Sequence, residues 1–111
     1  MEELMKVFTN NSFIVKQETS KAVEFEHVHT EELVYLLTNK EITVALNPVT
    51  VENFFLLNNA AKGLTHSTAL KRFPKRINTG ETPIPYGYSF KFQSAEELFC
   101  FLREFNLLTV K

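Results

Sequence analysis

The hydrophobic period of the chain changes within one stretch, YSFKFQSAEELFCFLREF, which covers residues 88–105. Aromatic residues first alternate with Ser89 and Lys91, which is typical of a strand with one buried face. Ser94 and Glu97 then form a capping box, in which each side chain accepts a hydrogen bond from a free N–H group at a helix start. The helix carries an apolar face of Leu98, Phe101, Leu102 and Phe105. The stretch therefore predicts a strand followed by a helix.

The first half of the chain contains further strand and helix patterns. Residues 13–16 and 22–26 alternate apolar and polar side chains and predict a hairpin. Thr30 resembles a helix cap, and the leucines at 33, 36 and 37 recur at helical spacing, so a helix is expected there. EITVAL (41–46) is β-branched and apolar and ends at Asn47-Pro48, which indicates a buried strand.

Two segments between these patterns are less regular. Residues 51–62 fit a helix capped by Thr50, and a strand through Phe54–Leu57 is the alternative. Residues 74–85 contain three of the four prolines, so an extended, mobile loop is expected.

The two halves of the chain share features of one plan. The segments that begin at Val23 and Tyr88 both contain a phenylalanine, the tripeptide EEL and a final Thr-Val. A duplicated strand-helix-strand unit is one interpretation, and coincidence is the other. The expected fold is a single α+β domain (1–111) with an antiparallel or mixed sheet of about five strands, covered mainly on one face by two to three helices.

Composition narrows the function classes. The chain has 111 residues, a net charge of −1 and one cysteine, so a small globular core without an internal disulfide is expected. The amino-terminal MEELMKVFTNNSF lacks the apolar run of a signal peptide, and the apolar runs elsewhere are too short to cross a membrane. We therefore expect a cytoplasmic protein without membrane contact.

Charge is distributed unevenly along the chain. Residues 1–61 carry four Lys and nine Glu, a net charge of −5, whereas residues 62–111 carry eight basic residues and four Glu, a net charge of +4. The basic segment 62–76 has no acidic residue and contains Lys71, Arg72, Lys75 and Arg76 around Phe73. One hypothesis is that these residues contact nucleic acid, with the cations on phosphates and Phe73 stacked on a base. The alternative is a solvated face that pairs with the acidic half of the chain.

Part of the basic segment is similar to a known DNA-binding element. Residues 63–73, GLTHSTALKRF, resemble the second half of a helix-turn-helix, with a glycine before a hydroxyl-rich helix and basic residues after it. This resemblance implies a recognition helix over these residues.

The aromatic content suggests a second class of function. The chain has eleven Phe and three Tyr, more than a small core readily buries. Tyr86, Tyr88 and Phe99 are the candidate contact residues of a protein-binding or homodimeric module.

Candidate residues for catalysis or metal binding are few. His27 and His29 would point to one side of a strand, but no Cys or further His accompanies them, and His66 has no acid nearby in the sequence. Cys100 lies off the apolar face of its helix without a neighbouring base. We therefore expect no metal, no cofactor and no enzymatic activity, and a small accessory protein of bacterial or phage type.

Overall fold

Helices and antiparallel strands alternate irregularly along the chain, and the computed structural model describes residues 2–110. Within these residues the elements are, in chain order, α1 (Glu2–Thr9), β1 (Phe13–Glu18), β2 (Ala22–His27), β3 (Leu33–Leu37), β4 (Ile42–Leu46), α2 (Pro48–Asn53), α3 (Phe55–Ala60), β5 (Leu64–His66), β6 (Lys75–Arg76), β7 (Ile84–Phe92) and α4 (Ala95–Thr109). The predicted α+β class is confirmed. The sheet has seven strands rather than about five because it includes the very short β5 and β6.

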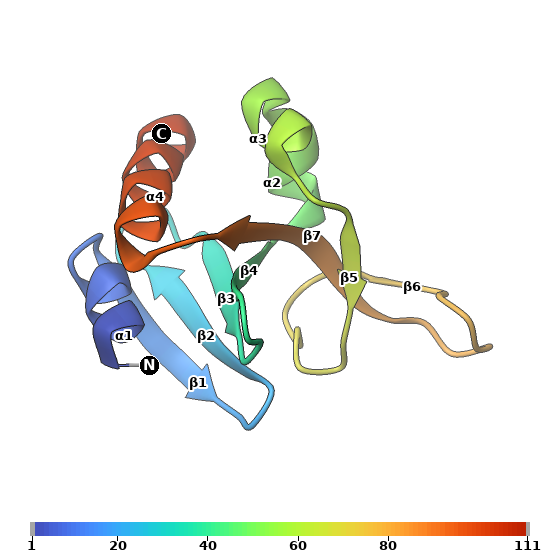
Figure 1. Ribbon diagram of the computed structural model, residues 1–111. Coiled ribbons are helices and arrows are strands. Elements are labelled where there is room, and N and C mark those ends of the chain that lie inside the picture. The colour runs from blue at the N-terminus through green and yellow to red at the C-terminus, as the bar shows by residue number, and fades with distance from the viewer. Residues whose placement is uncertain (1, 111) are drawn as a thin grey trace.

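The strands form one antiparallel sheet in the order β1-β2-β3-β4-β7-β5, with β6 paired to β7 as well (Figure 1). β1 to β4 form a meander. β7 pairs with β4, although α2, α3, β5 and β6 lie between these two strands in the sequence. The Tyr86 N–H donates to the Pro74 carbonyl beside β6, whereas the Ser67 N–H beyond β5 donates to the Pro85 carbonyl. The backbone N–H and C=O groups of adjacent strand residues point to opposite edges of the strand. Because Pro85 and Tyr86 are adjacent, β5 and β6 lie on opposite edges of β7.

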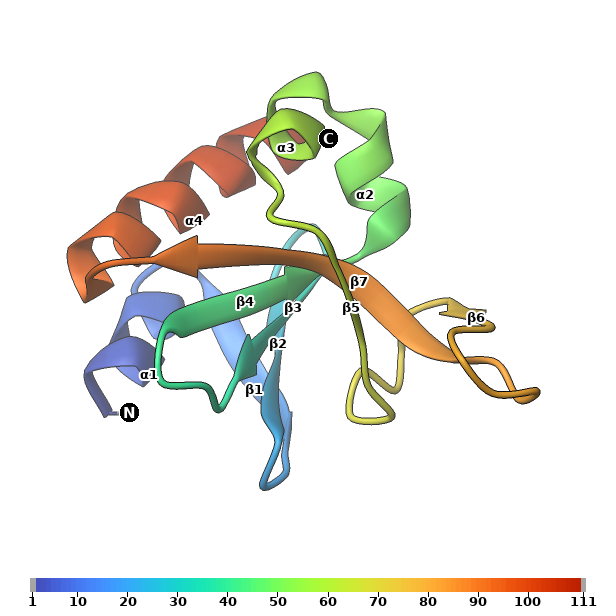
Figure 2. The same ribbon diagram turned by 45° about the vertical axis from the view of Figure 1, so that its right-hand side comes forward.

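The helices cover one face of the sheet, as predicted, but residues 2–110 form four helices rather than two to three (Figure 2). Alternate residues of the central strands point to this face, including Phe25, Leu36 and Val44. All four helices supply buried side chains to the same core: Val7, Phe8, Val51, Leu57, Leu98, Leu102 and Phe105. The ribbon also shows that β6 lies at the end of the molecule away from α1 and α4.

The opposite face of the sheet is covered by the segment between β5 and β6, residues 67–74, which we call the strap. Leu70 and Phe73 of the strap pack with sheet residues in a second buried cluster that includes Tyr35 and Ala45. A Cβ atom on Gly87 would lie 2.8 Å from the Leu46 carbonyl oxygen and 3.1 Å from the Phe73 ring. Glycine at this position therefore lets the strap approach β7 closely.

The helix predicted after Thr30 is wrong, because Leu33–Leu37 forms β3. Glu31 has a left-handed φ of 65°, which is incompatible with a helix start. Val34 and Leu36 contact the main core, and Leu33 and Tyr35 contact the strap cluster. A strand buried on both faces need not alternate in polarity, so its leucines reproduced a helical spacing.

The interpretation of the two halves as a duplicated strand-helix-strand unit is also wrong. The EEL tripeptide at 31–33 leads into β3, whereas the same tripeptide at 96–98 lies in α4. The first half is therefore a series of strands where the second half has a strand and a helix.

Residues 51–62, for which the sequence leaves a helix and a strand open, are mostly helical. α2 and α3 account for residues 51–60 apart from Phe54, which has an extended backbone. The cap is Asn47, whose side chain accepts from the Val49 N–H, rather than Thr50, whose hydroxyl donates to Glu32.

Two expectations for the region around the basic segment are corrected as well. Residues 63–73 form β5 and most of the strap without a helix, so the helix-turn-helix resemblance is wrong. Within 74–85, Lys75–Arg76 pairs with Ile84–Pro85, so this segment is partly a hairpin and not a loop throughout.

Candidate nucleic-acid interface

The side chain of Arg72 forms ion pairs with two glutamates of the same chain. Its Nη1 atom lies 3.3 Å from Oε2 of Glu24 and 2.8 Å from Oε1 of Glu26, both on β2. These carboxylates are nearly buried, with side chains 5% and 16% exposed, whereas the Arg72 side chain is 49% exposed. Arg72 therefore neutralises two acidic groups of the sheet and is the weakest of the predicted cations as a phosphate ligand.

A buried tyrosine completes this connection between the strap and the sheet. The Tyr35 hydroxyl donates to Glu24 and accepts from the backbone N–H of Arg72. Burial, followed by the hydrogen bond to Glu24, raises the pKa of Tyr35 far above its ordinary value. The hydroxyl therefore stays protonated and holds the strap in place.

Phe73 does not lie where base stacking would require it. Its side chain is 3% exposed and meets the Tyr35 ring edge to face, with the ring centroids 4.8 Å apart. The predicted role of Phe73 as an exposed stacking residue is thus corrected, because this ring closes the second face of the sheet.

Lys71 and Lys75 are brought together by the strap. Both line a hollow of about 310 Å³, together with the hydroxyl residues Thr68 and Thr82 and an apolar floor of Pro83, Ile84 and Pro85. None of the described residues that line this hollow is acidic. We call it the lysine hollow. Two ammonium groups and two hydroxyls without a competing carboxylate suit an anion such as a phosphate.

Arg76, the residue after Lys75, lies over an aromatic ring. Its guanidinium carbon is 5.2 Å from the centroid of the Tyr86 ring. The His66 ring stacks with Tyr86 at a centroid distance of 5.9 Å and an interplanar angle of 23°. The Nε2 atom of His66 is buried without a hydrogen-bond partner in residues 2–110, so no hydrogen bond at this atom orients the ring. We call these three side chains the Arg76 stack.

The other predicted contact residues are Tyr88 and Phe99. The Tyr88 hydroxyl donates to Glu52 of α2 at 2.9 Å, and this hydrogen bond is the main cause of a raised Tyr88 pKa. Phe99 is half-buried at the margin of the main core. The structure therefore brings Lys71 and Lys75 into one hollow, whereas Arg76 contacts Tyr86, with Tyr88 nearby. Phe99 lies apart from both groups at the margin of the main core.

The two histidines considered as metal ligands have a structural role at the end of β2. Nδ1 of His27 accepts from the N–H groups of His29 and Thr30 at 3.1 and 3.2 Å. No group of three or more potential metal-ligating side chains occurs among residues 2–110.

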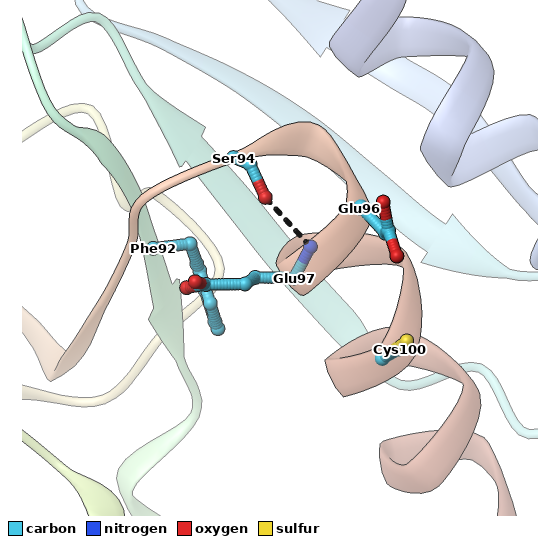
Figure 3. Close-up of a pocket in the computed structure, with 5 residues that line it drawn as sticks. All are labelled: Phe92, Ser94, Glu96, Glu97 and Cys100. Atoms are coloured by element: carbon cyan, nitrogen blue, oxygen red, sulfur yellow. Dashed lines mark hydrogen bonds between the residues drawn. The ribbon is translucent and has the colours of Figure 1, made fainter.

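Cys100 is exposed, as the sequence suggested, and lines an open hollow of about 590 Å³ at the start of α4 (Figure 3). The Ser94 hydroxyl accepts from the Glu97 N–H, and the Glu97 carboxylate accepts from the Gln93 N–H, so the predicted capping box is present. Glu96 points away from Ser94, and Cys100 lies one turn further along the helix. The described lining residues include no His, Lys or Arg that could stabilise the thiolate of Cys100.

An exposed apolar surface that the sequence reasoning missed lies on α3 and the end of α4. Phe55 is 76% exposed and Leu56 66% exposed, and Leu107 and Val110 are similarly open. A small hollow of about 160 Å³ lies between the two helices, lined mostly by apolar residues such as Leu56, Phe101 and Leu108. We call it the α3–α4 surface. The run FFLL at 54–57 was its signal, because four adjacent apolar residues cannot all face one core from a short helix.

Comparisons with known proteins assign no family. The chain matches no model of a known protein family, and no curated protein sequence is significantly similar to it. In the described part of the chain, no helix combines the length and apolar character needed to cross a membrane.

Proposed function

We propose that this chain is a small non-enzymatic accessory or regulatory protein that contacts nucleic acid through Lys71, Lys75 and Arg76. The lysine hollow carries this proposal, because it gathers two cations of the basic segment without an acidic neighbour among its described lining residues. Each lysine that neutralises a phosphate releases counterions, which favours binding and makes it sensitive to salt.

The strap explains how the hollow keeps its shape. Arg72, between the lysines in sequence, is held by Glu24 and Glu26, and its backbone N–H is held by Tyr35. Because Leu70 and Phe73 are buried on either side of Arg72, the backbone that carries Lys71 is fixed on the sheet. Because this backbone is already ordered, less conformational entropy is lost when a ligand binds.

The proposal is tested by measuring the binding of labelled DNA and RNA, single- and double-stranded, at several salt concentrations. A Lys71→Gln/Lys75→Gln variant should bind more weakly, and for single strands the slope of log affinity against log salt should flatten by about 0.7 for each lysine. The matched control is Lys16→Gln/Lys40→Gln, which removes two exposed lysines from the acidic half and should bind like the parent protein. Absence of binding by the parent protein at low salt would overturn the proposal, as would equal losses in both double variants.

A second candidate function, self-association, is favoured by the α3–α4 surface. Exposed phenylalanine and leucine side chains of this size are uncommon on a monomer unless they meet a partner. Sedimentation velocity over a range of protein concentrations should show a dimer that Phe55→Ser disrupts, with Val28→Ser as the control at another exposed apolar position. A monomer at all concentrations would exclude this candidate.

A further inference from the structure

We infer that the Arg76 stack is a platform for an unpaired base, so that the nucleic acid bound by this protein is single-stranded. The inference rests on the function proposed above and specifies its ligand. It concerns Arg76, Tyr86 and His66, which come from three different strands.

The platform is assembled by the pairing of β7 with both neighbours. His66 is directly opposite Tyr86 in the β5–β7 register, whereas Arg76 is opposite Ile84 in the β6–β7 register. Because β5 and β6 occupy opposite edges of β7, His66 and Arg76 reach the Tyr86 ring from opposite sides of the strand. The tyrosine ring is thereby held between them.

The outer component of the stack is free to meet a ligand. Arg76 is exposed, and within residues 2–110 it forms no salt bridge, in contrast to Arg72. An arginine on a protein surface ordinarily samples many rotamers, but here the aromatic ring below it favours a flat orientation. A flat guanidinium supported by an aromatic ring presents a planar cationic surface, on which nucleic-acid bases stack.

The relation between the platform and the lysine hollow favours a single strand over a duplex. Lys75 and Arg76 are consecutive residues of β6, so their side chains point to opposite faces of the sheet. A ligand with a phosphate in the hollow and a base on the platform must therefore turn around the edge of β6. A single strand can make this turn, whereas duplex DNA, with a persistence length of about 50 nm, cannot do so without a large deformation energy.

The experiment compares an oligothymidylate with a duplex of the same length and uses variants that separate charge from planarity. Arg76→Lys keeps the charge and removes the planar group, and Tyr86→Leu removes the support beneath it. Arg103→Lys, at an exposed position on α4, is the matched control. A single-stranded probe that contains 2-aminopurine reports stacking directly through quenching of its fluorescence.

The parent protein should bind the single strand more tightly than the duplex. Arg76→Lys and Tyr86→Leu should each weaken single-strand binding by about fivefold or more and reduce the quenching, as expected for loss of one stacked base. The salt dependence should stay unchanged, because Arg76→Lys conserves the charge. Arg103→Lys should have no effect.

Two results would overturn the inference, and only the second would also overturn the proposed function. If the parent protein binds nucleic acid but Arg76→Lys binds the oligothymidylate equally well, the platform is excluded and the proposed function remains. If the parent protein binds neither probe at low salt, the proposed function fails and the platform fails with it.

Discussion

The hydroxyl of Tyr35 lies 2.5 Å from Oε1 of Glu24, and both groups are buried beneath the strap. The carboxyl group of Glu24 accepts hydrogen bonds from both Tyr35 and Arg72. Tyr35 and Glu24 therefore connect the acidic half of the chain to the basic segment through their hydrogen bonds with Arg72.

Tyr35→Phe should lower the free energy of unfolding by about 1–3 kcal/mol, because Glu24 and the N–H of Arg72 each lose a buried hydrogen-bond partner. Urea unfolding followed by circular dichroism measures this difference. Tyr88→Phe removes a hydroxyl from an exposed hydrogen bond to Glu52 and should change stability by less than about 0.5 kcal/mol. Equal effects of the two substitutions would contradict a special role for the Tyr35 hydroxyl.

Gly87→Ala should destabilise the protein by about 1–3 kcal/mol, because the new methyl group forces the Leu46 carbonyl and the Phe73 ring apart. Gly80 is the control, since a Cβ atom there meets no atom within 4 Å. Thermal unfolding of both alanine variants checks the prediction. A Gly87→Ala protein as stable as its parent would mean that the strap does not pack against β7 as described.

Stability should decrease at mildly acidic pH because of His27. Burial, and then the charge of His29, lower the pKa of His27 below its ordinary value of 6.5, while Glu32 opposes the shift. The unfolded chain binds a proton at His27 more readily than the folded chain, so the free energy of unfolding falls as pH decreases below 6.5 and levels off below the folded-state pKa. Protonation of Nδ1 would also remove the acceptor used by the His29 and Thr30 N–H groups.

The test of this pH dependence is urea unfolding between neutral pH and mildly acidic pH. His27→Asn retains a side-chain acceptor and removes the titration, so its stability should decrease less steeply over this range. A variant with the same pH profile as the parent protein would assign the effect to other groups.

Ser94→Ala should cost about 1 kcal/mol of stability, because the Glu97 N–H at the start of α4 loses its acceptor. Ser94→Asp keeps an acceptor at the cap and should retain most of the stability. Chemical unfolding of both variants would distinguish loss of the cap from a general intolerance of substitution at this position.

β7 and α4 were predicted correctly from the face that each turns toward the main core. Phe90 and Phe92 face the helices, and Leu98 and Leu102 face the sheet, so the change of period near Ser94 was visible. β3 was missed because the strap covers its second face, and the strap is about 35 residues away in sequence. A local pattern contains no information about such a distant cover.

The candidate site was predictable to a similar extent. Lys71 and Lys75, both from the basic segment, line one hollow. The partners of Arg72 are 48 and 46 residues away, however, so its neutralisation by Glu24 and Glu26 had no local signal. The same reason applies to Phe73, whose burial depends on strands formed by the first half of the chain.

The order of the strands has a consequence for synthesis on the ribosome. The four strands of the meander emerge early, but β7, which pairs with β4 and also holds β5 and β6, emerges only with residues 84–92. Until β7 and α4 have left the exit tunnel, Val44 and Leu46 lack the neighbours that cover them in the finished core. The nascent chain therefore exposes the apolar edge of β4 until β7 pairs with it, and during this interval the edge is prone to aggregation.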